Sequence, residues 1–166
     1  TGDEGTVELL RTKRPNILVV LMESFGGALV ESFGGVKGAS TNLDRLSKEG
    51  IWFTNCYANS YRTDRGTVCT FSGYQSFPTL SVMKMPNKSR TLPSIAAELR
   101  KQGYHTDFLY GGDINFTNMK SYLLESGYQH LTADVDFPVS QRKNAWGVND
   151  DITFEWLYNK LKDRKD

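Results

Sequence analysis

The stretch of sequence that decides the fold is PNILVVLMES, residues 15–24. Its aliphatic residues at 17–22 form an unbroken run, which is typical of a strand covered on both faces rather than one with alternating polarity. Glu23 follows the run directly. The stretch therefore predicts a central strand of a mainly parallel sheet, with a carboxylate at the strand's carboxyl end.

Downstream of this run, the pattern predicts helices and strands in alternation. Residues 43–49 favour a helix, 51–57 a strand and 63–72 a second helix, whereas the two prolines within 74–90 indicate a surface excursion. The remaining predicted elements are a helix at 91–102, a strand at 106–110, a helix at 116–125 and a helix at 149–162. Such alternation predicts an α/β fold, a mainly parallel sheet with helices on both faces.

The composition limits the classes of protein. With 166 residues, the chain has the length of about one domain, and residues 1–15 are expected to be a leading segment or linker before a folded part at 16–166. A net charge of +1 gives no reason to expect nucleic acid as a partner. The run at 17–22 is far shorter than the ~20 apolar residues that span a bilayer, so the chain is expected to be soluble.

The two cysteines do not form a metal-binding pattern. Cys56 and Cys69 lie in neither a CxxC motif nor a Cys/His cluster. Two buried thiols are the simplest interpretation. A single disulfide between them stays open, because the sequence carries no information on the geometry that a bridge requires.

Three polar segments follow the predicted strands. They are Glu23, residues 59–66 and residues 111–115. Ligands of open α/β sheets gather at the carboxyl ends of the strands, so these segments are expected to form one site. A carboxylate such as Glu23 is costly to bury without a cation, which favours a metal ion or a basic partner. An exposed Glu bonded to a loop amide is an equally good interpretation.

Thr63 is the candidate nucleophile. The simpler interpretation makes Thr63 or Asp64 an ordinary helix N-cap. The functional interpretation places the Thr63 hydroxyl at the positive end of a helix, where an alkoxide and a phosphate or sulfate group are both favoured. A metal held by Glu23 would activate that hydroxyl without a histidine base.

The segment after the third predicted strand supplies a further candidate. Asp113 follows Gly111 and Gly112, small residues that let the backbone approach a ligand, so Asp113 would bind a substrate hydroxyl. An Asx turn that caps the next helix explains the residue as well and is the simpler interpretation. His105 and His130 are expected to be structural or solvated. The three tryptophans, Trp52, Trp146 and Trp156, are expected to be core residues, with a pocket-lining role as the alternative for Trp146, which lies on a loop.

Several motifs together resemble a known family. They are NILVVLMESF at 16–25, TNLDRL at 41–46, EGIWFTN at 49–55, RTDRG at 62–66 and WGVND at 146–150. From about residue 16 to residue 162 the chain resembles the sulfatase-like catalytic domain of the lipoteichoic acid synthase and phosphoglycerol transferase group, in the alkaline phosphatase superfamily. The resemblance implies a divalent metal ion (Mn, Mg, Zn or Ca).

The resemblance also implies roles for single residues. Glu23 would be a metal ligand, and Thr63 both a metal ligand and the nucleophile that carries a covalent phospho-intermediate. Asp113 would correspond to a carboxylate that lines the substrate pocket. Members that transfer glycerol phosphate hold the substrate with a Trp and an Arg, where this sequence has Thr117 and Met119.

One part of the family's metal site has no counterpart. The family completes the site with an Asp-His pair downstream, and no Asp-His dipeptide occurs in this sequence. We therefore expect the chain to be the N-terminal portion of the catalytic domain, with an incomplete sheet. Alone, it is expected to be inactive, since two ligands are fewer than the roughly three that a catalytic site normally has.

The leading functional hypothesis is a parent enzyme that acts on phosphate esters. It would be a metal-dependent phosphoryl-group transferase or phosphoester hydrolase with a lipid-linked or other ester substrate, membrane-anchored with this domain outside the cytoplasm. Sulfate-ester hydrolysis is the alternative, although neither Cys56 nor Cys69 lies in the Cys/Ser-x-Pro-x-Arg pattern of that reaction. A third hypothesis is an inactive interaction unit, whose exposed sheet edge would favour self-association.

Overall fold

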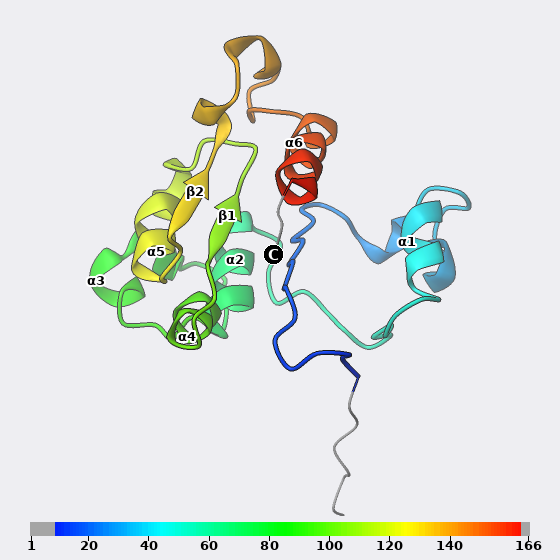
Figure 1. Cartoon of the computed structure of the whole chain (residues 1–166), viewed down its shortest axis with the longest axis horizontal. Coiled ribbons are helices and arrows are strands. Elements are labelled where there is room, and N and C mark those ends of the chain that lie inside the picture. Colours follow the sequence, from blue (N-terminus) through cyan, green and yellow to red (C-terminus); the bar gives the residue numbers. More distant parts are fainter. Residues whose placement is uncertain (1–8, 164–166) are drawn as a thin grey trace, which may run out of the picture. The chain divides into compact units, whose positions relative to one another are not determined.

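A computed structural model describes residues 9–163 of the chain (Figure 1). The chain divides into two compact units, with the boundary between Trp52 and Phe53. Part of the expected leading segment, residues 1–8, lies outside the described residues.

The first unit is built from short helical turns. Two 3-10 turns, Gly27–Leu29 and Glu31–Phe33, precede helix α1, Thr41–Leu46, which begins two residues before the predicted start. Asp44 connects the second turn to the helix. Its carboxylate accepts one hydrogen bond from the Ser40 hydroxyl and another, at 3.0 Å, from the Ser32 backbone N–H. The bond from Ser40 lowers the pKa of Asp44 below its usual value.

The predicted strands at 17–22 and 51–57 are wrong for this structure. Neither segment is assigned to a strand, and the side chains from Ile17 to Met22 are all roughly half exposed. A strand exists only when a neighbouring strand supplies its hydrogen bonds. The described part of the first unit contains only turns and one short helix, so nothing in that unit pairs with 17–22.

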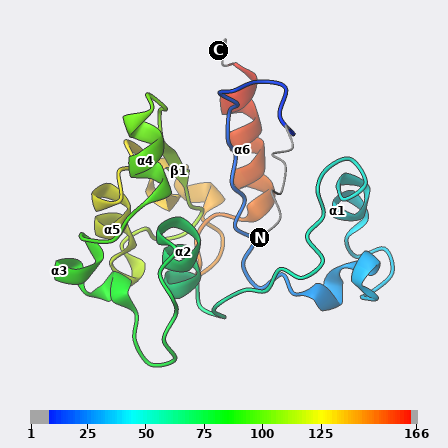
Figure 2. The same cartoon turned by 90° about the horizontal axis from the view of Figure 1, so that it is seen from below.

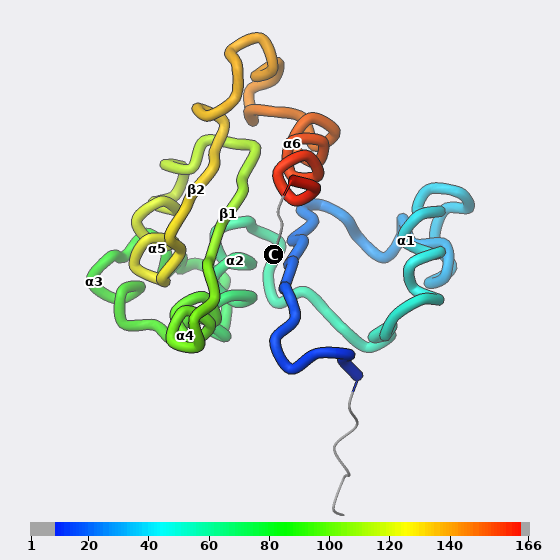
Figure 3. Tube along the Cα trace, viewed as in Figure 1, coloured from blue at the N-terminus to red at the C-terminus, as the bar shows by residue number. Residues whose placement is uncertain are grey.

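The second unit contains the sheet and most of the helices. Its two strands, β1 (Asp107–Leu109) and β2 (His130–Thr132), pair in parallel with Phe108 opposite Leu131 (Figure 3). Its helices are α2 (Thr63–Ser72), α3 (Pro86–Ser89), α4 (Ile95–Lys101), α5 (Met119–Glu125) and α6 (Asp150–Lys162). The predicted α/β class and parallel pairing are confirmed. Strand β2 was not predicted, because its three residues are too few to show a period.

Helices cover both faces of this sheet. Phe108 packs edge-on against Phe71 of α2, with ring centroids 5.9 Å apart. Its neighbour Asp107 lies on the opposite face, since successive strand residues alternate, and there its carboxylate is 3.8 Å from the Lys160 ammonium of α6. Figure 2 shows α6 along its length.

The hydrophobic core lies between α2, α4, α5 and the sheet. Its most deeply buried side chains are Met83, Met119, Tyr122, Leu123 and Val68. Met83 and Val82 belong to a 3-10 turn, Val82–Lys84, inside the segment that was predicted to be a surface excursion. The prediction of a surface excursion is wrong at this turn. The two prolines of 74–90 indicate where the chain turns, but they carry no information on whether the turn is exposed to solvent.

Both cysteines are free thiols. Cys69 is half-buried on α2 and Cys56 is exposed, so the disulfide interpretation does not hold and Cys56 is not buried as expected. Burial raises the pKa of the Cys69 thiol. Across residues 9–163, no helix is long and apolar enough to span a membrane.

Candidate functional site

Thr63 is the first residue of α2 and is half-buried. The N-cap is Arg62, in an extended conformation, so the interpretation of Thr63 or Asp64 as the N-cap is wrong. Thr63 is the first helical residue, so its side chain lies at the N-terminal end of α2. Thr63 therefore lies at the positive end of the α2 dipole, as the functional interpretation requires.

The helix that carries Thr63 is anchored firmly. Val68 and Phe71 are buried in the core, and the Ser72 hydroxyl lies 2.7 Å from the Tyr122 hydroxyl of α5. Arg65 donates to the backbone oxygen of Pro78 at 2.6 Å. Gly73, in the left-handed conformation, ends the helix at the predicted residue. These contacts fix α2 at both ends.

Asp113 forms the Asx turn that was the simpler interpretation. Its Oδ1 accepts from the backbone N–H of Asn115 at 2.8 Å, and its backbone oxygen accepts from Phe116 at 3.1 Å. The side chain is nevertheless exposed. The turn therefore occupies one carboxylate oxygen and leaves the group accessible to solvent, while the next helical turn, Phe116–Asn118, has Asn115 as its N-cap without a side-chain capping bond.

The glycines before Asp113 make room for the chain itself. A Cβ on Gly112 would lie 2.8 Å from the Trp146 backbone oxygen, and one on Gly111 would lie 2.9 Å from the Thr153 hydroxyl. Val148 donates its N–H to the Gly111 oxygen at 2.8 Å. The loop at 146–148 therefore occupies the space that a side chain at either glycine would need, and close approach of a ligand to their backbone stays a prediction.

The two positions that replace the family's Trp and Arg have different environments. Met119 is 1% exposed and belongs to the core. Thr117 is half-buried, with its hydroxyl 3.6 Å from the Met83 sulfur. Thr117 and Asn118 both have positive φ, 56° and 67°, a conformation that costs energy in residues other than glycine. The backbone is therefore strained just after Asp113.

Glu23 lies in the first unit, exposed, directly after the 17–22 segment. The next residue, Ser24, has a φ of 55°.

His105 and His130 are exposed as expected, and the His105 ring nitrogen lies 3.2 Å from the Asp107 carboxylate. The sequence singles out Glu23, Thr63 and Asp113, and the structure places Glu23 in one unit and the other two in the second.

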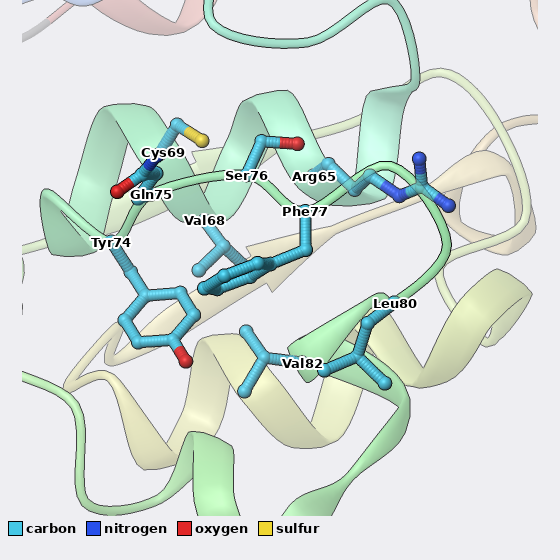
Figure 4. Close-up of a pocket in the computed structure, with 9 residues that line it drawn as sticks. All are labelled: Arg65, Val68, Cys69, Tyr74, Gln75, Ser76, Phe77, Leu80 and Val82. Atoms are coloured by element: carbon cyan, nitrogen blue, oxygen red, sulfur yellow. The ribbon is translucent and has the colours of Figure 1, made fainter.

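Concavities of different sizes lie beside α2 and beside the segment at 115–124 in the second unit. One, of about 10 Å³, lies beside α2, where the side chains of Val68, Phe77 and Val82 converge with Tyr74 beside them (Figure 4). It has room for about one water molecule, too little for an ester substrate. The other is an open hollow beside Asn118 and Lys120.

The donor chemistry of the candidate metal ligands fits a hard divalent ion. Glu23 offers carboxylate oxygens and Thr63 a hydroxyl oxygen, which suit Mg, Mn or Ca and are acceptable to Zn. Over residues 9–163, no group of three or more His, Cys, Asp or Glu side chains is arranged to hold a metal.

Comparison with known proteins assigns the family. The sulfatase family matches residues 15–166. This chain belongs to the sulfatase family. The domain is of the alkaline phosphatase superfamily, to which a solved structure with 37% identity to this chain also belongs.

A protein of the alkaline phosphatase superfamily from Vibrio parahaemolyticus has a similar crystal structure, with 37% identity and a TM-score of 0.72. The match covers 84% of this chain and 33% of that one. The lipoteichoic acid synthase LtaP from Listeria monocytogenes, 14% identical with a TM-score of 0.56, shares the fold over 63% of this chain and 25% of its own.

A curated relative is the N-acetylglucosamine-6-O-sulfatase of Bacteroides thetaiotaomicron, 29% identical over 98 residues. These residues are 57% of this chain and 17% of that relative. The sulfatase chain described here therefore spans a minor part of the relatives that it matches.

Proposed function

We propose that the protein is a metal-dependent enzyme that transfers or hydrolyses a phosphoryl group through Thr63. The observation that carries the proposal is the position of Thr63 at the first residue of α2, in a chain of the sulfatase family. The anchoring of α2 by Ser72 and Arg65 supports it, because a nucleophile must be held in a fixed geometry.

The chemistry assigned to Thr63 is a two-step transfer. In the first step, the Thr63 oxygen forms a bond to phosphorus while the bond from phosphorus to the leaving alcohol breaks. The hydroxyl proton passes to solvent, and the leaving alkoxide takes up a proton. In the second step, the oxygen of an alcohol or water forms a bond to the same phosphorus while the bond from the Thr63 oxygen to phosphorus breaks. The attacking group loses its proton to solvent, and the Thr63 oxygen takes up a proton.

Glu23 and Thr63 are the residues that would hold a divalent ion. Such an ion, when bound, favours the alkoxide form of a hydroxyl and neutralises charge on an ester. The carboxylate of Glu23 contributes the negative charge that attracts a cation, and the exposed Asp113 would accept a hydrogen bond from a substrate hydroxyl.

The substrate that we favour is a phosphoglycerol-type ester. Its leaving group is an alcohol, and it is carried on a lipid. The resemblance to the lipoteichoic acid synthase group supports this choice, and the LtaP fold is compatible with it. We also propose that the whole protein is anchored in a membrane with this domain outside the cytoplasm. Fractionation of cells, with protease added to the outside, tests the location.

Sulfate-ester hydrolysis is the second candidate, because a relative at 29% identity is an N-acetylglucosamine-6-O-sulfatase. The two candidates differ in the ester that is turned over. Turnover of a phosphodiester and of the matching sulfate ester, measured on the full-length protein and on this chain, separates them. The proposal predicts phosphodiester turnover by the full-length protein that Thr63→Ala abolishes; unchanged turnover in that variant contradicts it.

A third outcome corresponds to the inactive interaction unit. It would be shown by the absence of turnover in both forms of the protein together with concentration-dependent association of this chain. Sedimentation at several concentrations measures that association directly.

A further inference from the structure

Positive charge is concentrated in the first part of the second unit. Residues 62–120 contain eight Lys and Arg against four Asp and Glu, whereas residues 121–163 contain four Lys and Arg against seven Asp and Glu. The formal charges of the two stretches are therefore +4 and −3, a division that the net charge of +1 for the whole chain hides. A local excess of one sign attracts partners of the opposite sign even when the whole chain is nearly neutral.

Four of these cations lie on neighbouring elements, namely the turn Val82–Lys84, α3 with its C-cap, and α5. They are Lys84, Lys88, Arg90 and Lys120. Helices α3 and α5 lie side by side (Figure 1 and Figure 2). The turn Phe116–Asn118, just before α5, packs against Val82–Lys84, where Asn118 Nδ2 donates to the Met83 backbone oxygen at 3.0 Å. The four cations therefore belong to one part of the surface.

None of the four cations is neutralised by a carboxylate. All four residues are exposed, and within residues 9–163 none of them forms an ion pair. By contrast, Lys101 of α4 pairs with Glu98 at 2.6 Å. The one carboxylate of α5, Glu125, lies about 140° around the helix axis from Lys120, at 3.6 residues per turn. The positive charge of these residues is therefore directed to solvent.

Large apolar side chains are exposed on the same elements. Phe116 and Leu124 are each 52% exposed. Leu124 lies about 40° around α5 from Lys120, and both residues line the same open hollow. Phe116 lies in the turn that packs against Val82–Lys84. Together, the cations and the two apolar residues form the α3–α5 face, which consists of Lys84, Lys88, Arg90, Phe116, Lys120 and Leu124.

We propose that the α3–α5 face docks on the surface of a bilayer that contains anionic phospholipids. Lys and Arg side chains attract the headgroup phosphates, and exposed apolar side chains enter the boundary between headgroups and acyl chains. The lipid-linked ester proposed above would then lie beside the domain. The inference goes beyond the reaction assigned to Thr63, because it names a partner surface whose binding is measured without turnover.

A nucleic acid matches the α3–α5 face less well. Its phosphates would attract the same cations. Leu124, however, gains little from a phosphate backbone, which offers no apolar surface to cover its side chain. A bilayer provides both the negative charge and an apolar layer, so it satisfies every member of the face.

Sedimentation of this chain with lipid vesicles tests the inference. One set of vesicles contains about one part phosphatidylserine to three parts phosphatidylcholine, and the other contains phosphatidylcholine alone. Phosphatidylserine carries no phosphoglycerol group, so its binding reports on charge and not on recognition of the proposed substrate. We expect partitioning to the anionic vesicles to be about tenfold or more stronger, and to fall as added salt screens the exposed charges.

Two double variants separate the contributions of charge and apolar contact. Lys88→Glu with Lys120→Glu should weaken partitioning about twentyfold or more, because each basic residue near an anionic surface contributes about fivefold. Phe116→Ser with Leu124→Ser should weaken partitioning about tenfold and leave the binding of a DNA duplex unchanged, because only the bilayer covers apolar side chains. All four side chains are exposed, so these substitutions leave the core intact.

Lys48→Glu with Lys143→Glu is the matched control, because both lysines are exposed outside the α3–α5 face and the net charge changes equally. It should weaken partitioning less than about fivefold, the effect of one residue at the surface. Three results would each overturn the inference: equal partitioning to the two kinds of vesicle, an equal loss in the control, or tighter binding to the DNA duplex than to the anionic vesicles. Thr63→Ala should partition like the native chain, so failure of the proposed nucleophile, seen as turnover by that variant, is a separate result.

Discussion

The Ser72 hydroxyl and the Tyr122 hydroxyl lie 2.7 Å apart in the core, joining α2 to α5. Ser72 is 7% exposed and Tyr122 is fully buried. A buried hydroxyl needs a partner, so each residue satisfies the other. This contact ties the far end of the helix that begins with Thr63 to the centre of the second unit.

Tyr122→Phe should destabilise the chain by about 1–3 kcal/mol, because it leaves the Ser72 hydroxyl buried without this partner. The double variant with Ser72→Ala should lose less than the sum of the two single losses. Urea unfolding measures all three. Tyr158→Phe is the control, since Tyr158 is 65% exposed, and should change the free energy of unfolding little. Additive losses would show that the hydroxyls are not coupled.

Stability should fall as the pH rises above about 10. Burial raises the pKa values of Tyr122 and Tyr128 above the usual tyrosine value, so the folded state holds these protons more tightly than the unfolded state. The stabilisation is complete below the unfolded pKa and is lost as pH rises through the folded pKa. Tyr128→Phe should flatten the decline in thermal midpoint between pH 9 and pH 11, roughly the range in which free tyrosine ionises. An equally steep decline in that variant would contradict the assignment.

Gly147→Ala should destabilise the second unit by about 2 kcal/mol or more. The residue has positive φ, and an added Cβ would lie within 2.2 Å of the Gly111 oxygen. Gly66→Ala is the counterpart, because Gly66 lies within α2 with nothing within 4 Å of its added Cβ. That variant should stabilise by about 0.5–1 kcal/mol. Thermal unfolding compares the two, and a neutral Gly147→Ala would show that the turn is not fixed.

The elements that sequence predicts well are those with local signals. The end of α2 at Gly73 was predicted because glycine adopts the left-handed conformation of a helix end without a steric clash. The strand at 106–110 contains β1, and the parallel pairing follows from helices between the strands. These signals lie within a few residues of the feature that they determine.

The features that sequence misses depend on distant partners. The run at 17–22 shows a preference for burial, but no pattern in it specifies a neighbouring strand, and in this structure it is exposed. Of the candidate site, Asp113 illustrates the same limit: its sequence context allowed a turn or a ligand, and only the structure shows the bond to Asn115. The exposure of Trp146 was likewise not predicted, because the sequence places the residue on a loop without specifying whether its ring is buried.

Glu23→Gln should weaken binding of Mn²⁺ to the full-length protein by about tenfold or more, because a carboxylate ligand loses its charge. Calorimetric titration measures the affinity. Glu49→Gln is the control, since Glu49 is an exposed carboxylate of the same unit that pairs with Arg45. Equal affinities in the native protein and in Glu23→Gln would remove Glu23 from the metal site.

The covalent intermediate gives the most direct test of the central claim that Thr63 is the nucleophile. The full-length protein is quenched with acid during turnover of a phosphodiester, digested, and its peptides are analysed by mass spectrometry. We predict a phosphoryl-linked group on the peptide that contains Thr63, absent from Thr63→Ala. Turnover with the group on another residue, or with no group on the Thr63 peptide at any quench time, would contradict the account.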